Sequence, residues 1–242
     1  MNFSFKFTDA YPQIISKLND AMIKKLSKQL YSSDNIKIVE KAVRLFVKST
    51  IQSSKVWKSL SGGDPKGLDK HFGIPKGTVI ERLDILLNIW ADQILVKPNT
   101  IKRAKSFILS YDFYAVYADW ADVLDSEAGV TYNKSKLHPE GQRLHWLSWL
   151  LIEGDQLEID GYSIKFGPNS ASRSGGAIMV PKLSWRIPTG FGPFNSNSNF
   201  VTRQLDLVAK SADFRKVLID AMQKVGRTEP TIDDILASFR II

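Results

Sequence analysis

The spacing of the apolar residues changes once along the chain, from a helical pattern to an alternating one, and this change limits the possible folds. Between residues 14 and 94 apolar side chains recur every three or four positions in three stretches, which is typical of helices with one apolar face. Between residues 107 and 117 they occupy every second position, which is typical of a strand. The order predicts an α+β fold in which helices precede most of the strands.

Three helices are expected first, and the opening two are amphipathic. Asp9 is the predicted N-cap of the first helix, which carries Pro12 in its first turn and runs to Leu30. Asp34 is the predicted N-cap of the second, with lysines and an arginine opposite its apolar face. The breaker-rich segment SGGDPKGLDKHFGIPKG then precedes a third helix over residues 78–95, which ends at Lys97-Pro98-Asn99.

The rest of the chain predicts a mixed, mainly antiparallel β-sheet with one inserted helix and a C-terminal helix. The inserted helix is LHWLSWLLIEG, which ends at Gly154, and a tight hairpin is expected to turn at Asp160-Gly161. The expected strands cover residues 101–119, 130–132, 157–159, 162–166, 177–180 and 183–186. A long helix over residues 199–225 and a short one over residues 231–239 are expected to follow.

No repeat or linker divides the chain. We therefore expect an N-terminal helical region, residues 1–100, and an α+β region, residues 101–242, within one continuous structural unit. With 43% hydrophobic residues the chain can bury a sizeable core. The N-terminus shows no secretion signal and no apolar run reaches the length of a membrane helix, so we expect synthesis in a cytoplasm and no membrane partner.

The positive charge belongs to the N-terminal part of the sequence. There are 19 Lys and Arg against 9 Asp and Glu up to Phe107, and 14 against 16 in the remainder. Such an asymmetry indicates either a surface for nucleic acid or an acidic protein, or lysines that keep helices soluble. The aromatic residues of the strand after Lys105 lie among Ser, Asp and Ala, which favours a core strand over base stacking.

Catalytic and metal-binding patterns are weak in this sequence. The chain has no cysteine and three histidines, which excludes thiol chemistry and disfavours a multi-histidine site. His138, Glu140 and His145 remain a candidate acid/base or metal group, but a packed or capping His145 is the stronger interpretation. The Asp119, Asp122 and Asp125 series lacks the glycine turn and terminal Glu of a calcium loop. We expect no enzyme activity, catalytic residue, metal or cofactor.

The segment SRSGGAIMVPKLSWRIP raises the question of a phosphate-binding loop. Such a loop opens into a helix whose first amides face the anion. Here Gly175 and Gly176 lead instead into a strand pattern, and Pro181 prevents a helix from starting there. The glycines are therefore interpreted as a loop that enters a strand and places Arg173 where it can reach a neighbouring surface.

Several stretches in order resemble a family of tailed-bacteriophage virion proteins, the tail-completion or head-to-tail connector (neck) proteins. They are IQSSKVWKSLSGGDPKGLDKHFGIP, LHWLSWLLIEGDQLEIDGYSIKFGP, SRSGGAIMV, SWRIP and NFVTRQL, and they span about residues 50 to 205. The sequence departs from the family's pattern at His138-Pro139-Glu140-Gly141 and at TGFGPFNSNSN. The resemblance implies a mixed sheet with a long helix, assembly into rings and no enzymatic activity.

The resemblance and the residues together lead to a structural hypothesis. The expected function is a virion protein that forms or completes a ring at the neck, and the alternatives are a basic DNA-binding or packaging accessory protein and, weaker, a metal-dependent hydrolase. Expected partners are copies of the chain, other neck, portal or tail proteins and packaged DNA without sequence preference, in a virion assembled in the host cytoplasm. The predicted assembly interface contains Ser172, Arg173, Ser174, Gly175, Gly176, Trp185, Phe191, Phe194 and Asn199.

Overall fold

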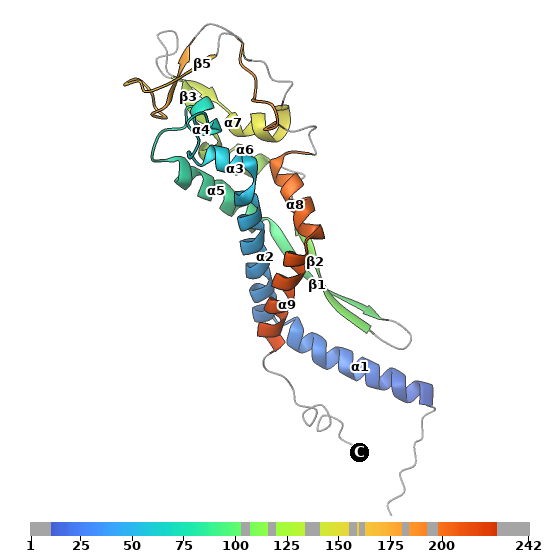
Figure 1. Cartoon of the computed structure of the whole chain (residues 1–242). Helices are drawn as coiled ribbons and strands as arrows, with labels where there is room; N and C mark the ends of the chain where they lie inside the picture. The colour runs from blue at the N-terminus through green and yellow to red at the C-terminus, as the bar shows by residue number, and fades with distance from the viewer. Residues whose placement is uncertain are drawn as a thin grey trace, which may run out of the picture. The chain divides into compact units, whose positions relative to one another are not determined.

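The computed structural model confirms the α+β class, with helices and small antiparallel sheets (Figure 1). It describes residues 11–102, 107–115, 120–133, 141–154, 159, 163–180, 184–192 and 198–226. Two compact units share the chain. The first unit combines Met1–Val43, Leu95–Tyr114 and Arg215–Ile242, and the second combines Arg44–Ile94 and Ala115–Phe214. Each unit therefore draws on residues from both sides of position 100.

The helices of the N-terminal region agree with the sequence pattern, but the N-cap of the second helix is not the residue predicted. The predicted cap Asp9 lies outside the described residues, and Asp34 lies in the first turn of the second helix instead of capping it. Ser32 takes the capping role, because its hydroxyl accepts a hydrogen bond from the Asn35 amide at 3.4 Å. The helices are α1 Tyr11–Leu30, α2 Ser33–Ser53, α3 Lys55–Leu60, α4 Leu68–His71 and α5 Val79–Asp92. The single-turn α4 lies inside the segment expected to be irregular.

The described strands form three two-stranded sheets instead of one larger sheet. The pairs are β1 Ile94–Lys102 with β2 Phe107–Ala115, β3 Thr131–Asn133 with β4 Gln142–Leu144, and β5 Ser163–Phe166 with β6 Ala177–Val180. The pattern predicts a helix to residue 95 and a strand from residue 101, whereas β1 already begins at Ile94 and includes Pro98. A proline is tolerated in a sheet of two strands, because each strand has one edge without a neighbour to which it must donate.

The hairpin expected at Asp160-Gly161 lies outside the described part of the chain. Of the residues that flank it, Ile159 pairs with Trp185, and Ser163 pairs antiparallel with Val180. A described reversal of the chain lies between β5 and β6. The Asp-Gly signal is local, whereas the pairing with β6 joins four residue pairs and determines the register.

The C-terminal helix is also interrupted. The pattern predicted one helix over residues 199–225, but the structure has α8 Phe200–Lys210 and α9 Ala212–Gly226. Ser211 lies between them, and its hydroxyl accepts a hydrogen bond from the Phe214 amide at 2.9 Å. A serine in this position caps a new helix instead of continuing the old one. The short helix predicted over residues 231–239 lies outside the described residues.

In the first unit, two tyrosines join the end of α1 to the β1–β2 sheet. The rings of Tyr31 and Tyr111 meet edge to face at a centroid distance of 5.5 Å. The Tyr31 hydroxyl donates to the Asn99 carbonyl at 2.6 Å, and the Tyr111 hydroxyl donates to the carbonyl of Leu30. Asn99 in turn donates to the Asp112 carboxylate at 2.9 Å. These contacts fix the end of α1 by polar bonds to the backbone.

The core of the second unit is a cluster of aromatic rings around Phe72. The Phe72 ring stacks on Trp146 at 5.6 Å and contacts Trp149 and Trp185, each at 5.8 Å. Phe72 and Trp146 are completely buried, and burial of such rings is among the largest contributions a side chain makes to stability. Trp146 and Trp149 come from the predicted inserted helix, which the structure divides into α7 Trp146–Ser148 and a wider turn, η2 Trp149–Glu153, before Gly154.

A second group of contacts fixes the connection before β3. Arg82 of α5 donates to the carbonyls of Glu127, Ala128 and Val130, at 3.0, 3.5 and 2.7 Å. The carbonyls surround the single turn η1 Glu127–Gly129, which follows α6 Ala121–Leu124. The guanidinium thus satisfies backbone acceptors at a helical end.

Among the described helices none is long and apolar enough to cross a membrane.

Candidate functional site

The loop that joins β5 to β6, residues 167–176, contains the first five predicted interface residues, and we call it the β5–β6 loop. Its base is closed by a hydrogen bond from the Gly167 amide to the Gly176 carbonyl at 2.9 Å. The Ser172 hydroxyl donates to the Ala177 carbonyl at 2.6 Å and accepts from the Ala177 amide at 3.2 Å. Asn169 makes a further turn by accepting from the Ala171 amide at 2.8 Å. The loop is therefore held by its own polar side chains.

The β5–β6 loop packs on the segment between α4 and α5, and glycines make this contact possible. A methyl group at Gly175 would lie 3.1 Å from the Lys76 side chain, and one at Gly176 would lie 3.1 Å from the Lys70 side chain. On the opposite segment, a methyl group at Gly73 would lie 2.8 Å from Met179. A Cβ atom at these glycines would therefore fit only if the long side chain beside it shifted. A hydrogen bond from the Lys76 amide to the Arg173 carbonyl, 2.9 Å long, joins the two segments.

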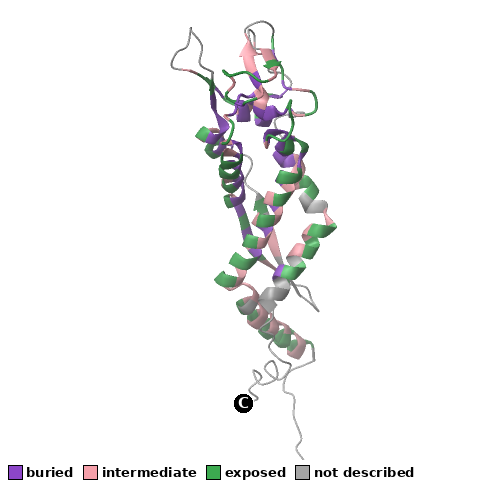
Figure 2. Cartoon of the chain, turned by 60° about the vertical axis from the view of Figure 1, so that its left-hand side comes forward, coloured by how far each residue is buried: buried purple, intermediate pink, exposed green. Residues whose placement is uncertain are grey.

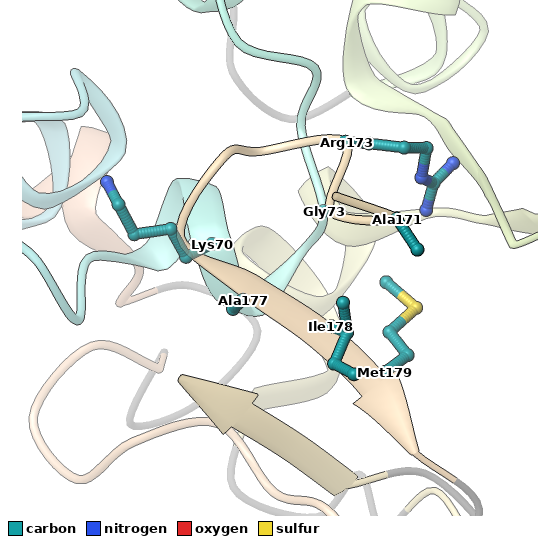
Figure 3. A pocket seen from close by; sticks show the side chains of 7 residues that line it. All are labelled: Lys70, Gly73, Ala171, Arg173, Ala177, Ile178 and Met179. Atoms are coloured by element: carbon teal, nitrogen blue, oxygen red, sulfur yellow. The ribbon is translucent and has the colours of Figure 1, made fainter. Parts of the chain in front are cut away.

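A pocket of about 460 Å³ lies between the β5–β6 loop and β6 (Figure 3). Ala171, Ile178 and Met179 line it with apolar groups, and Arg173 stands at its edge. The guanidinium of Arg173 passes over Gly73, where a methyl group would lie 2.9 Å from its Nη2. Figure 3 shows the end of the Lys70 side chain pointing away from this group. The pocket is therefore lined by apolar groups and by the cationic side chains Lys70 and Arg173, a form that suits an apolar side chain next to an acidic one.

The ammonium group of Lys70 forms an ion pair with the carboxylate of Asp69. Its Nζ lies 2.8 Å from Oδ2 of Asp69, and the two side chains are 11% and 5% exposed. Burial raises the pKa of Asp69, while the bond to Lys70 acts in the opposite direction. A second pocket of about 380 Å³ borders this pair and Lys76 on the other side of the loop contact. The ion pair is a structural element there, because a buried charge without its partner is strongly unfavourable.

Trp185 is connected to α4 through a histidine. Its indole N–H donates to Nδ1 of His71 at 3.2 Å, and the His71 ring meets Phe166 edge to face at 5.1 Å. Burial lowers the pKa of His71; a hydrogen bond to the Lys66 carbonyl and the charge of Asp64 oppose this change. Nδ1 can accept a hydrogen bond from the indole N–H only when the His71 imidazole is neutral. His71 is thus a core acceptor that positions Trp185.

The last predicted interface residues belong to the start of α8 and the segment before it. Asn199 is the N-cap of α8: its Oδ1 accepts from the amides of Val201 and Thr202, each at 3.0 Å. Its Nδ2 donates to the Leu151 carbonyl at 3.1 Å, and the residue is completely buried. Phe191 lies beneath the ammonium of Lys55, which is 4.8 Å from the ring centre.

The structure divides the predicted interface into surface residues and supporting residues. Arg173 and Gly175 are exposed, Ser172, Gly176 and Phe191 are half-buried, and Phe194 lies outside the described residues. Ser174, Trp185 and Asn199 are buried, so within this unit they hold the loop, the aromatic core and α8 in place. The α4–α5 segment under the loop was not among the predicted site residues. Its signal was available in the spaced glycines and lysines of KHFGIPKG.

The sequence candidates for catalysis are not brought together in the described part of the chain. His138 and Glu140 lie outside it, as does Asp119, while His145 is exposed just before α7. Asp122 and Asp125 are exposed at either end of α6. Within the described ranges, no three residues of the His, Asp and Glu types form a group that could hold a metal ion.

Comparison of the chain with protein-family models, with curated proteins and with solved structures found no match. The geometry described above and the sequence therefore carry the functional argument.

Proposed function

We propose that this chain is a structural protein of a tailed-bacteriophage virion, which forms or completes a ring at the head-to-tail joint. The observation that carries the proposal is the form of the β5–β6 loop. Its backbone is fixed by Ser172, Asn169 and the bond to Lys76, yet Arg173 stays exposed. A surface loop that is ordered before binding loses little conformational entropy when it makes a contact between subunits.

The sequence supplies the rest of the argument. The stretches that resemble neck proteins include SWRIP and KHFGIP, and they contain Trp185, His71 and Phe72 of the aromatic core. The resemblance thus falls on residues that shape the unit and support the β5–β6 loop. This is the arrangement we expect where a family keeps a framework that presents an assembly loop.

A charge reversal in the phage tests the proposal. Arg173→Glu is expected to prevent the joining of heads and tails, because it reverses the charge of the presented loop, and the purified chain should stay folded. Lys165→Glu is the matched control, since Lys165 is an exposed cation on β5. Electron microscopy of lysates would count joined particles. Normal virions from Arg173→Glu, or a virion map with one asymmetric copy of the chain, would contradict the proposal.

A DNA-binding or packaging accessory function is the second candidate, and the basic N-terminal sequence favours it. Lys17, Lys24 and Lys28 are exposed on α1, and lysines of this kind contact phosphates without reading sequence. A gel-retardation assay over a range of salt concentrations separates the candidates. We expect weak, sequence-independent retardation at physiological salt. Tight binding there, with a steep loss as salt rises, would favour the accessory function.

A further inference from the structure

We infer that the pocket beneath Arg173 receives Ile85, on the outer face of α5, from a second copy of this chain. The inference rests on the proposed ring function and names the two surfaces that would form the ring contact. Both surfaces belong to the second unit. Because the two surfaces are different, each copy would bind one neighbour through its pocket and the other neighbour through its α5.

The outer face of α5 combines apolar and acidic side chains. Ile80 and Ile85 are 56% and 43% exposed. The other exposed residues of this face are Glu81, Asp84, Asn88 and Asp92. Spacings of three, four and seven residues bring them onto one side of the helix, opposite the buried Leu83, Leu86, Leu87 and Trp90. Glu81 and Asp84 therefore place two carboxylates beside the exposed isoleucines, while Asp92 is paired with Arg44 at 3.1 Å and Asn88 accepts a hydrogen bond from Lys48.

The pocket offers the complementary properties. Its apolar lining comes from Ala171, Ala177, Ile178 and Met179, and its volume of about 460 Å³ is ample for one isoleucine side chain. Lys70 is paired with Asp69, and Arg173 is an exposed cation in the pocket lining. An Ile85 seated in the pocket would bring the carboxylates one turn before it and next to it, Glu81 and Asp84, toward that guanidinium. Arginine at an interface is suited to such carboxylates.

The charges also argue against nucleic acid as the occupant of this pocket. A duplex is held by phosphates on a cationic groove, whereas here four of the lining residues are apolar and a single exposed arginine stands at the edge. A contact between two unlike patches is heterologous, and its repetition produces a ring when the rotation closes and a filament when it does not. This is the type of contact that a ring of identical subunits requires.

Cross-linking of introduced thiols tests the contact directly. The chain has no cysteine, so a chain with Ile85→Cys and Ile178→Cys carries thiols only at the inserted residue Ile85 and in the pocket. A short thiol-specific cross-linker is expected to produce a ladder of covalent oligomers at high protein concentration. The pair Ile85→Cys and Lys58→Cys is the control, because Lys58 is exposed on α3 and does not line the pocket. No ladder, or an equal ladder from the control, would overturn the inference.

A charge exchange provides an independent measurement. Arg173→Glu in the cross-linking variant should reduce the cross-linking rate about tenfold, since a close interfacial charge pair contributes on the order of the free energy of one tenfold step. Adding Glu81→Lys and Asp84→Lys should restore the rate. Retained cross-linking after Arg173→Glu, or no recovery in the combined variant, would overturn the inference. Unfolding curves of each variant verify the fold.

The outcomes separate this inference from the proposed function. Cross-linked oligomers from a chain that is absent from virions would support the contact and refute the virion role. A ring in the virion whose contacts exclude α5 and the pocket would refute the contact and leave the virion role in place. A ladder that forms only when DNA is present would refute the inference in favour of assembly on nucleic acid.

Discussion

The helices α1 and α5 have similar apolar spacings but very different burial. In α5, of the second unit, Leu83, Leu86 and Leu87 are at most 3% exposed. In α1, of the first unit, Leu18 is 40% exposed and no described residue of the helix is buried (Figure 2). Periodicity thus predicts which face of a helix is apolar, but the burial of that face depends on what tertiary structure covers it.

The difference has a visible cause in the contacts of α5. Trp90 at its C-terminal end meets Trp120 at 6.3 Å and Phe200 at 5.9 Å, each edge to face, and Arg82 holds three backbone carbonyls. Residues from distant parts of the sequence therefore surround one side of α5. At the end of α1, Tyr31 donates to the Asn99 carbonyl and the Leu30 carbonyl accepts from Tyr111.

The largest expected effect tests this comparison with one matched pair of substitutions. Leu86 is completely buried in α5, so Leu86→Ala should lower the free energy of unfolding by about 2–5 kcal/mol, the range for a buried leucine that leaves a cavity. Leu18→Ala on α1 should lower it by less than about 1 kcal/mol, because much of that side chain already contacts water. Urea unfolding followed by circular dichroism measures both. Equal losses would mean that α1 is as strongly covered as α5.

The next effect concerns close packing at a glycine in the second unit. A methyl group at Gly67 would lie 2.5 Å from the Ser59 carbonyl and 2.7 Å from Oδ1 of Asp69. Gly67→Ala should therefore destabilise the chain by about 1–3 kcal/mol, because backbone must move to admit the methyl group. Gly63→Ala is the control, since nothing lies within 4 Å of the added atom. A tolerated alanine at position 67 would show that the α3–α4 connection yields more easily than its packing indicates.

Local signals in the sequence predicted local structure well and pairing poorly. Helical spacing gave α1, α2 and α5, and Gly154 was expected as a helix end, which its φ of 57° confirms. The Asp160-Gly161 turn lies outside the described residues, and the described partner of β5 is β6, a pairing that could not be weighed from a local motif. In the candidate site too, surface exposure was predictable from the sequence but long-range contacts were not. Arg173 was expected at the surface, but the burial of Trp185 and Asn199 depends on contacts with His71 and Leu151, far away in sequence.

A smaller effect is expected from one capping bond in the second unit. The Ser54 hydroxyl accepts a hydrogen bond from the Trp57 amide at 3.1 Å at the start of α3, and the residue is buried. Ser54→Ala should cost about 1 kcal/mol of unfolding free energy, as is usual for the loss of an N-cap. Ser53→Ala serves as the control, because that side chain is exposed and bonds to the carbonyl of its own helix at 2.7 Å. Equal losses at the two positions would show that the cap contributes no more than a surface serine.

The smallest expected effect on stability is that of His71. It changes the free energy of unfolding only when the solution is made acidic. Burial lowers the pKa of His71 below the ordinary value of 6.5, which the unfolded chain retains. The unfolded state therefore binds the proton first as the pH falls, so the contribution of His71 to stability is complete above pH 6.5 and is lost as the pH falls toward the folded-state pKa. Protonation also removes the acceptor for the Trp185 indole.

The measurement is the difference in unfolding free energy between pH 7.5 and pH 5.5, for the natural chain and for His71→Gln. Glutamine keeps a side chain that can accept a hydrogen bond but does not titrate, so the variant should lose less stability on acidification than the natural chain. His145→Gln is the control, because it makes the same substitution at a histidine that is exposed and has no part in the Trp185 contact. Identical pH dependence in the natural chain and His71→Gln would show that another group carries the acid response.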